Sequence, residues 1–505
     1  MRGWAPVVIS ALAMAAMALW GLDRGSMYST EEVSVWAARL PFADLWHLLS
    51  HVDAAHGLYY VMMHPVLAAG ANEVLLRVPS VIGAVAAAAL TARVAWRLSR
   101  SAAVATLAGL IFAATPVLND FAQVGRSYAI DVALVMAASL ALLHAVDASA
   151  RHPHAPRGAL WRSWALYGGL VVLAAYMHEM TSLMLIAHAV TLLWARTGRV
   201  TLRRWALTAL GAAVLMIPIV LITHAQSSAL AWIRFGGWRD VRGLIGGLLG
   251  PSAWSIGIMV GLMAIAVIAA LRPSATGTGR PHPVGVAQFA LPLFVLPGAT
   301  LLIESAIATP LYGGTRYVLY SAAAAALLAA AGAWHLARLG SRLLRRRPLG
   351  RRVVLAAVSA AVVLALAVAG WPHQQLLRTP QGRPQDNAAA SAFLAAHARQ
   401  GDAILYLPAA SGLAELAYAH DFAKVANIAT AVSPEASGTF YGISKPLPRI
   451  RTAILARDRV WEFSDDGKTG MSPRQNAERR LLHQRYHLTL DHTFTGVRVM
   501  LWVKK

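Results

Sequence analysis

The chain has 505 residues, of which 57% are hydrophobic and only 13% are charged, and its net charge is +22. This composition is far too apolar for a soluble globular protein and indicates an integral membrane protein. The sequence contains no cysteine, which excludes disulfides, thiolate chemistry and cysteine-ligated metal sites.

Apolar runs of about 20 residues, the length needed to cross a bilayer, recur along most of the chain. They predict eleven spans, at residues 4–22, 79–97, 103–118, 128–146, 164–177, 180–195, 205–223, 251–271, 287–308, 317–337 and 353–370. The first run, Trp4 to Leu22, lacks a small-residue cleavage signature and is interpreted as a retained helix rather than a signal peptide. We therefore expect a polytopic, all-α membrane domain over residues 1–370.

Basic residues gather in every second connection between these spans. The clusters are Arg93/Arg97/Arg100, Arg151/Arg157/Arg162, Arg196/Arg199/Arg203/Arg204, Arg272/Arg280 and the run from Arg338 to Arg352. By the positive-inside rule, these connections and the N-terminus are cytoplasmic. The net positive charge is then a topology signal, reinforced by anionic lipid, rather than a sign of nucleic acid binding.

Acidic residues before residue 370 gather on the opposite side. Only Asp147 belongs to a cytoplasmic connection, whereas Asp131, Glu179 and Glu304 lie at or just within the outer ends of spans. An ionisable group near the bilayer centre costs about 2.5–3.5 kcal/mol on insertion scales, so one that is kept there marks a functional site by default. We expect the outer ends of the helices to form a polar cavity that carries carboxylates.

The segment between the first two spans, residues 23–78, is a long outer loop, and loops of this length are usually functional. Its sequence predicts three short helices, in EEVSVWAARL, FADLWHLLSH and HGLYYVMMHPVLAAG, and we expect Pro65 to interrupt the last one. We expect them to lie in the membrane interface. Their amphipathic anchors are Trp36, Trp46, Tyr59 and Tyr60.

After the last span, the Pro- and Gln-rich stretch 371–386 reads as a linker. The remainder, 387–505, predicts a small α/β domain. Its elements are a helix in AAASAFLAAHARQ, strands in DAILYLP and RVWEFS, a helix in PRQNAERRLLHQ, and a terminal pair of strands in HLTLDH and GVRVMLWV. An odd number of spans places this domain outside the cell. It has no nucleotide-binding loop, so we expect an accessory role.

Several of these stretches together resemble one superfamily. The chain is similar to the GT-C polyprenyl-phosphate-sugar glycosyltransferases, in particular the family 39 (protein mannosyltransferase-like) group with its actinobacterial mannosyl- and arabinosyltransferase-like members. The resemblance rests on an ordered set of stretches over residues 1–330: STEEVSVW, HVDAAHGLYYVMMHP, LLRVPSVIGA, GRSYAID, YMHEMTSL and PLYGGTRYVLYS. It implies a multi-pass plasma-membrane enzyme that moves a sugar from a polyprenyl-phosphate donor to an extracytoplasmic hydroxyl of a glycan, lipid or protein.

The resemblance also implies a catalytic role for the adjacent pair Glu31 and Glu32. A phosphate leaving group needs no strong acid, so one general base suffices to activate the acceptor hydroxyl, with inversion at the anomeric carbon. The family's pair normally begins with Asp, whereas this chain has Glu31 there. Glu31 matches the base by position, but either carboxylate remains a candidate. Like-charge repulsion within the pair favours a protonated member. The alternative is a pair that solvates an interfacial helix.

Two arginines are candidates for the donor phosphate, because a guanidinium pairs well with phosphate oxygens. Arg126 lies at an outer span end, although the family's acid two residues earlier is replaced by Val124. The alternative for Arg126 is an ion pair with Asp120 or Asp131. Arg316 lies at the outer end of the tenth span, and its alternative is snorkelling to the interface.

The remaining candidates would contact the sugar or the phosphate. The donor-binding residues implied by the resemblance are Asp53, His56, Arg126, Tyr128, His178, Glu179, Arg316 and Tyr317. Satisfied helix-end pairs or loop caps are the alternatives for His178 with Glu179 and for Asp53 with His56. No ligand pair has a recognisable metal spacing, so we expect no cofactor, with a divalent ion as the alternative.

Two other classes of function remain open. A transporter or lipid-carrier flippase would show inverted repeats and broken helices at mid-depth, and no repeat is evident. A non-catalytic scaffold would depend on its C-terminal domain and not on Glu31 and Glu32.

Overall fold

The computed structural model describes residues 3–152, 160–230, 233–271, 284–308, 310–342, 348–466 and 470–505. The chain forms two compact units. Unit 1 consists of Met1–Trp20 and Arg77–Gln374, and unit 2 consists of Gly21–Leu76 and Gln375–Lys505. The loop between the first two predicted spans therefore belongs to the same unit as the C-terminal domain.

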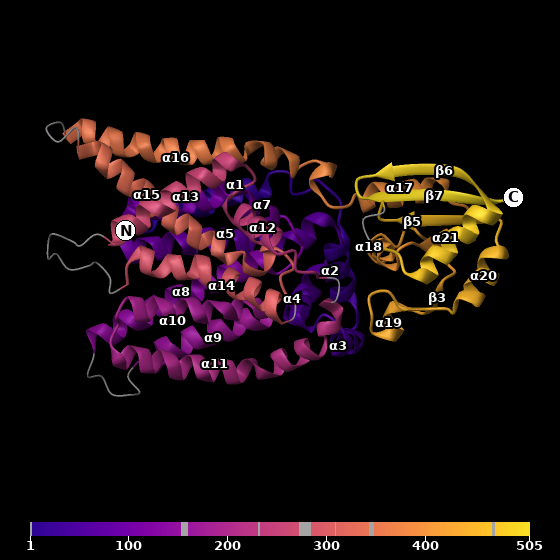
Figure 1. The fold of residues 1–505 in the computed structure, drawn as a ribbon, viewed down its shortest axis with the longest axis horizontal. Coiled ribbons are helices and arrows are strands. Elements are labelled where there is room, and N and C mark those ends of the chain that lie inside the picture. Colours follow the sequence, from indigo (N-terminus) through magenta and orange to yellow (C-terminus); the bar gives the residue numbers. More distant parts are fainter. Residues whose placement is uncertain are drawn as a thin grey trace. The chain divides into compact units, whose positions relative to one another are not determined.

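Unit 1 is a bundle of long helices (Figure 1). Its helices are α1 (Ala5–Leu19), α5 (Glu73–Ser99, which begins in unit 2), α6 (Ala102–Ala114), α7 (Pro116–Ala122), α8 (Tyr128–Arg151), α9 (Trp161–Met177), α10 (Met184–Trp194), α11 (Arg199–Ala225), α12 (Trp238–Leu249), α13 (Ala253–Leu271), α14 (Val286–Ile307), α15 (Tyr320–Arg342) and α16 (Pro348–Leu376). Short 3-10 turns η2 (Glu179–Leu183), η3 (Ser227–Leu230) and η4 (Thr315–Val318) join some of them.

Each of the eleven predicted spans coincides with a helix or helix pair of unit 1. Among the described residues, seven helices are long and apolar enough to cross a membrane: α5, α8, α11, α13, α14, α15 and α16. The pair α6–α7, bent by 66° at Thr115, makes an eighth if it counts as one span. Pro116 explains the bend, because proline disfavours a helical conformation in the residue before it. The other predicted spans coincide with the shorter helices α1, α9 and α10, so the total of eleven remains a prediction.

Small residues bring the helices of unit 1 close together. The first half of α15, from Tyr320 to Ala330, is buried throughout, and this stretch is largely alanine. A Cβ atom added at Gly332 would lie 1.9 Å from the carbonyl oxygen of Leu262 in α13, so only glycine allows that contact. Without a hydrophobic driving force in lipid, close backbone packing of this kind holds membrane helices together.

In unit 2, the segment before α5 folds into three helices, as predicted, with a 3-10 turn between the second and the third. They are α2 (Ser29–Arg39), α3 (Phe42–His51), the 3-10 turn η1 (Ala54–His56) and α4 (Gly57–Ala68). The prediction that Pro65 interrupts the last helix is wrong, because the helix continues through it to Ala68. Pro65 removes one backbone hydrogen bond from this helix, because proline has no N–H to donate.

The expectation that these helices anchor in the interface through their aromatic residues needs correction. Tyr59 and Tyr60 are fully buried and Trp36 is 7% exposed, whereas Trp46 is 74% exposed. Packing explains the difference, since α2 packs against both α4 and the short helix α18 of the C-terminal part. Three of the four aromatic side chains are therefore core residues of unit 2.

The C-terminal part of unit 2 is the predicted α/β domain. Its elements are α17 (Asn387–His397), β1 (Asp402–Tyr406), α18 (Leu413–Ala417), β2 (Val425–Asn427), β3 (Thr430–Val432), α19 (Pro434–Ser437), β4 (Ile443–Ser444), α20 (Leu447–Leu455), β5 (Arg459–Ser464), α21 (Pro473–Arg485), β6 (Tyr486–Phe494) and β7 (Val497–Lys504), with 3-10 turns η5 (Pro380–Gly382) and η6 (Ala409–Gly412). Helix α16 ends at Leu376, six residues beyond the end predicted for the last span.

Five strands form one sheet in the order β2-β1-β5-β7-β6. Strand β1 is parallel to β2 and β5, while β7 is antiparallel to both β5 and β6. Strand β1 is buried throughout, and an apolar core lies on each face of the sheet. Strands β3 and β4 form a separate two-stranded ladder. The predicted strands and helices of this domain are all present, and the short β2, β3, β4 and α18 to α20 were not predicted.

Candidate functional site

The acidic pair lies in the first turn of α2, and both side chains are buried: Glu31 is 0% and Glu32 is 1% exposed. The backbone N–H groups of both residues donate to the carbonyl of Tyr28, at 2.7 and 3.1 Å, which starts the helix. A carboxyl group in the first helical turn interacts favourably with the helix dipole. The free-energy cost of burying a charged group is nevertheless far larger than the stabilisation by the helix dipole.

The environment of Glu32 is set by burial and by one amide. The side-chain Nδ2 of Asn387, at the start of α17, donates to Oε1 of Glu32 at 2.6 Å. Burial raises the pKa of Glu32 to about 8, the Asn387 hydrogen bond opposes this rise, and repulsion by Glu31 adds to it. Like-charge repulsion is thus the smallest of the three causes, and removal from water is the largest. At neutral pH most Glu32 is protonated.

Asp53 and His56 form a small network in the turn before α4. Asp53 has a left-handed backbone, with φ of 60°, and its Oδ1 lies 2.9 Å from Nδ1 of His56. The hydroxyl of Tyr60 donates to the other carboxylate oxygen, Oδ2. This network joins the turn to α4, so Asp53 is held by two partners within unit 2. Sequence reasoning placed Tyr60 at the membrane interface and missed this contact.

In unit 1, four of the predicted residues form one cluster, which we call the His178 cluster: Tyr128, His178, Arg316 and Tyr317. The ring centroid of His178 lies 5.8 Å from Tyr128 and 5.2 Å from Tyr317. The guanidinium carbon of Arg316 lies 5.3 Å from the centroid of the Tyr317 ring. His178 and Tyr128 are buried. The cluster joins the start of α8, the end of α9 and the turn η4, which are distant in sequence.

Two further candidates lie on the same elements of unit 1. Arg126 is 7% exposed and lies in the turn before α8, where the hydroxyl of Ser80 donates to its carbonyl and to that of Val124. Glu179 follows His178 and accepts a hydrogen bond from the hydroxyl of Thr223 in α11. This partner is a side chain of a distant helix rather than neighbouring backbone, so the role of Glu179 in donor binding remains a prediction.

Some buried polar residues were not among the site residues predicted from the sequence. Arg77 in α5 is fully buried, and its position in the apolar run LLRVPSVIGA was the available signal. Asn387 gave no signal, because it lies 355 residues from Glu32 in a stretch interpreted as the beginning of an accessory domain. In the described parts of the chain, no group of three or more His, Asp or Glu side chains is placed to hold a metal ion.

Comparison with solved structures identifies the fold of the whole chain. The chain has the GT-C fold: a polytopic helical domain with a long first loop, followed by a small α/β domain. ArnT from Cupriavidus metallidurans, in a crystal structure bound to undecaprenyl phosphate, is 14% identical, with a TM-score of 0.60 over 99% of this chain and 98% of that one. Its structure in the apo state gives a TM-score of 0.59 at 15% identity, with the same coverage.

The oligosaccharyltransferase of Archaeoglobus fulgidus, in a complex with zinc and sulfate, is 13% identical. Its TM-score is 0.50 over 99% of this chain and 73% of that one. No model of a known protein family matches the sequence, and neither does any curated protein. At these low identities the likeness concerns the fold.

Proposed function

We propose that this protein is a membrane glycosyltransferase that takes a sugar from a polyprenyl-phosphate donor and transfers it to an acceptor hydroxyl outside the cell. The observation that carries the proposal is the buried carboxyl pair Glu31 and Glu32 on the first-loop helix of a GT-C fold. The fold neighbour ArnT, crystallised with undecaprenyl phosphate, supports a polyprenyl carrier. The arginine clusters, which follow the positive-inside rule, support an extracytoplasmic site.

The proposed reaction is a single inverting displacement. The acceptor oxygen attacks the anomeric carbon, the bond between that carbon and the phosphate oxygen breaks, and its electron pair leaves on the polyprenyl phosphate. The hydroxyl proton goes to Glu31, which acts as general base. We assign the base to Glu31 because Glu32 is held by Asn387 and is mostly protonated at neutral pH. Glu32 then acts as a positioning residue for the first turn of α2.

The His178 cluster and Arg126 are the proposed donor-binding residues. Arg316, supported by the ring of Tyr317, and Arg126, in the turn before α8, would neutralise the donor phosphate as it leaves. His178 and Tyr128 would contact the sugar or the phosphate. We also propose Asp53 and His56 as contacts to donor or acceptor, and a mannosyl- or arabinosyl-type donor with an envelope glycan, glycolipid or protein as acceptor. No cofactor takes part in this scheme.

The test uses purified full-length protein in lipid with a panel of radiolabelled polyprenyl-phosphate sugars and a membrane extract as acceptor. We expect release of polyprenyl phosphate with one sugar, a loss of at least about 100-fold in Glu31→Gln, as for general-base removal, and residual activity in Glu32→Gln. Asp44→Asn removes an exposed carboxylate from α3 and is the matched control. Release that persists unchanged in both Gln variants refutes the proposal. No release with any donor favours a transporter or flippase.

A further inference from the structure

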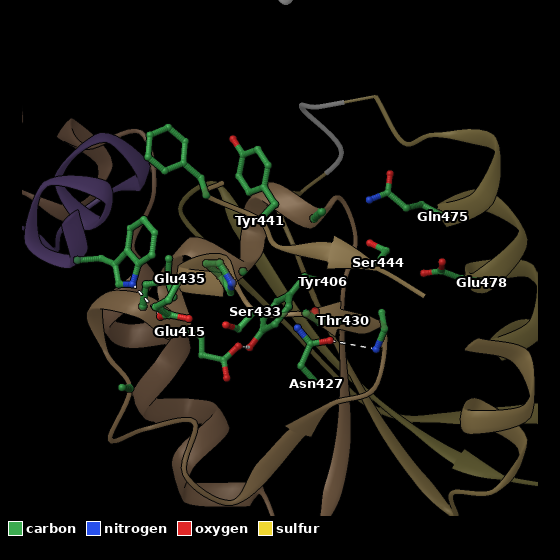
Figure 2. Close-up of a pocket in the computed structure, with 18 of the residues that line it drawn as sticks. Tyr406, Glu415, Asn427, Thr430, Ser433, Glu435, Tyr441, Ser444, Gln475 and Glu478 are labelled. Carbon is green, nitrogen blue, oxygen red and sulfur yellow. Dashed lines mark hydrogen bonds between the residues drawn. The ribbon is translucent and has the colours of Figure 1, made fainter. Parts of the chain in front are cut away.

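Unit 2 contains a cavity that the proposed mechanism does not use. Its volume is about 490 Å³, within the range of about 300–1,000 Å³ that is usual for small-molecule sites. Helix α2 contributes one part of its wall (Figure 2). The other parts come from the α/β domain, namely from β1, η6, α18, β2, β3, α19, β4 and α21. The cavity thus joins the helix of the acidic pair to the α/β domain, within one unit.

Aromatic rings form part of this wall. They belong to Trp36, Tyr406, Phe440 and Tyr441, and Trp36 meets Phe440 edge to face with centroids 6.3 Å apart. Trp36 and Tyr406 are buried, whereas Tyr441 is 48% exposed. Rings of this kind give large, rigid contact area to the apolar face of a ligand.

Polar side chains form another part of the wall, beside alanine, leucine and proline residues. Figure 2 shows Glu415 and Glu435 on one side, with Gln475 and Glu478 of α21 on the other. Glu415 accepts from the hydroxyl of Tyr406 at 2.8 Å, and Glu435 accepts from Nε1 of Trp36 at 3.1 Å. The carboxyl groups are thus fixed by aromatic side chains that line the same cavity.

Glu478 is the buried acceptor of this wall. It is 2% exposed, and its Oε1 accepts no hydrogen bond among the described residues. The same Oε1 lies 3.3 Å from Nε of Arg474, which is its charge partner without a hydrogen bond of good geometry. Burial raises the pKa of both Glu415 and Glu478, and a protonated carboxyl group can both donate and accept. Hydroxyl groups have the same dual capacity.

This combination limits the kind of ligand. An isoprenoid chain would leave the buried polar groups without partners, which is costly. Among the described residues that line the cavity, an anionic ligand would meet three carboxyl groups and a single guanidinium, that of Arg474. A ligand with many hydroxyls and an apolar ring face matches both kinds of wall. We infer that this cavity binds a segment of an uncharged glycan.

The position of the cavity suggests what the glycan is for. Trp36 follows Glu31 by five residues on α2, about 7.5 Å along the helix axis. Its indole contributes to the cavity and hydrogen-bonds to Glu435. A glycan held there lies close to the helix that carries the acidic pair. We assign it as part of the acceptor, an assignment that rests on the proposed function, whereas glycan binding itself does not.

The test measures binding before transfer. Full-length protein in lipid nanodiscs is exposed to an array of neutral mono- to tetrasaccharides of manno, gluco, galacto and arabino configuration, with phosphorylated and uronic acid analogues and spermidine alongside. Asn427, at the end of β2, also lines the cavity. Affinity for any array member that binds is then measured for Tyr441→Ala, Asn427→Ala and a control, Phe42→Ala. Phe42 is 58% exposed in unit 2 and does not line the cavity.

We expect a neutral saccharide to bind, with about tenfold weaker affinity in Tyr441→Ala, the effect of losing one aromatic contact, and unchanged affinity in the control. Absence of binding by every neutral saccharide, preference for an anionic saccharide or for spermidine, or equal affinity in all variants overturns the inference. Binding that depends on Tyr441 without any sugar transfer upholds the cavity and refutes only the proposed function. Transfer with an unchanged acceptor KM in Tyr441→Ala refutes the acceptor assignment.

Discussion

The buried carboxyl group of Glu32 should make the stability of unit 2 depend on pH. Its pKa is about 8 in the folded chain against an ordinary value of 4.5, with burial as the main cause. Between these two values the unfolded chain loses the Glu32 proton while the folded chain keeps it. The free energy of unfolding therefore falls as the pH rises from 4.5 through 8 and is constant above that, as far as Glu32 contributes.

The size of this change in the free energy of unfolding follows from the shift of the Glu32 pKa. Each pKa unit corresponds to about 1.36 kcal/mol, so the three units between pH 5 and pH 8 remove about 4 kcal/mol. Glu32→Gln has nearly the same shape, keeps an oxygen to accept from Asn387, and cannot ionise. We expect the wild type to lose about 4 kcal/mol more than this variant over that range, or on the order of 10 °C in melting temperature for a unit of this size.

The assay is thermal unfolding of the purified full-length protein, followed by tryptophan fluorescence at pH 5, 6, 7 and 8. Other buried carboxyl groups, such as Glu462, also contribute to the pH dependence, so the informative quantity is the difference between wild type and Glu32→Gln at each pH. Asp44→Asn, in which an exposed carboxylate is removed, should follow the wild type. If Glu32→Gln and wild type lose the same stability between pH 5 and pH 8, Glu32 is not a buried neutral acid and its assignment as a positioning residue is wrong.

Four other outcomes are expected. Arg126→Ala and Arg316→Ala should each raise the donor KM by roughly 10- to 150-fold, the effect of losing a charged hydrogen bond, in steady-state release assays; an unchanged KM excludes a phosphate contact. Asp53→Ala should melt earlier than Asp53→Asn, because Asn tolerates the left-handed backbone at this position better than Ala; equal melting temperatures contradict this. Asp147→Asn should destabilise unit 1 by about 3–5 kcal/mol, since it leaves the buried Arg97 guanidinium, now 2.5 Å from the carboxylate, without its charge partner; a wild-type melting curve argues against this pair. EDTA should leave polyprenyl-phosphate release unchanged, whereas a loss restored by a divalent ion would show a metal requirement.

The sequence by itself determined the spanning helices of unit 1, although not α12, and most of the α/β domain. Long apolar runs must form helices in a bilayer, because only a helix satisfies its own backbone hydrogen bonds there. The short apolar runs in DAILYLP and RVWEFS, with their β-branched and aromatic residues, favour buried strands, which appear as β1 and β5, paired in parallel. The resemblance also placed Tyr128, His178, Arg316 and Tyr317 among eight candidate donor-binding residues, but it did not group these four or predict their contacts with one another.

Tertiary structure alone decided which polar groups meet. Trp36, Tyr59 and Tyr60 are of the residue types that anchor proteins at membrane interfaces, yet packing within unit 2 buries them. Asn387 reaches Glu32 across 355 residues, and no local pattern carries such a pairing. The shift of the Glu32 pKa comes mainly from removal of water by this packing, and only secondarily from the neighbouring carboxylate visible in the sequence. Burial depends on every element packed around a group, which is why only the folded chain fixes it.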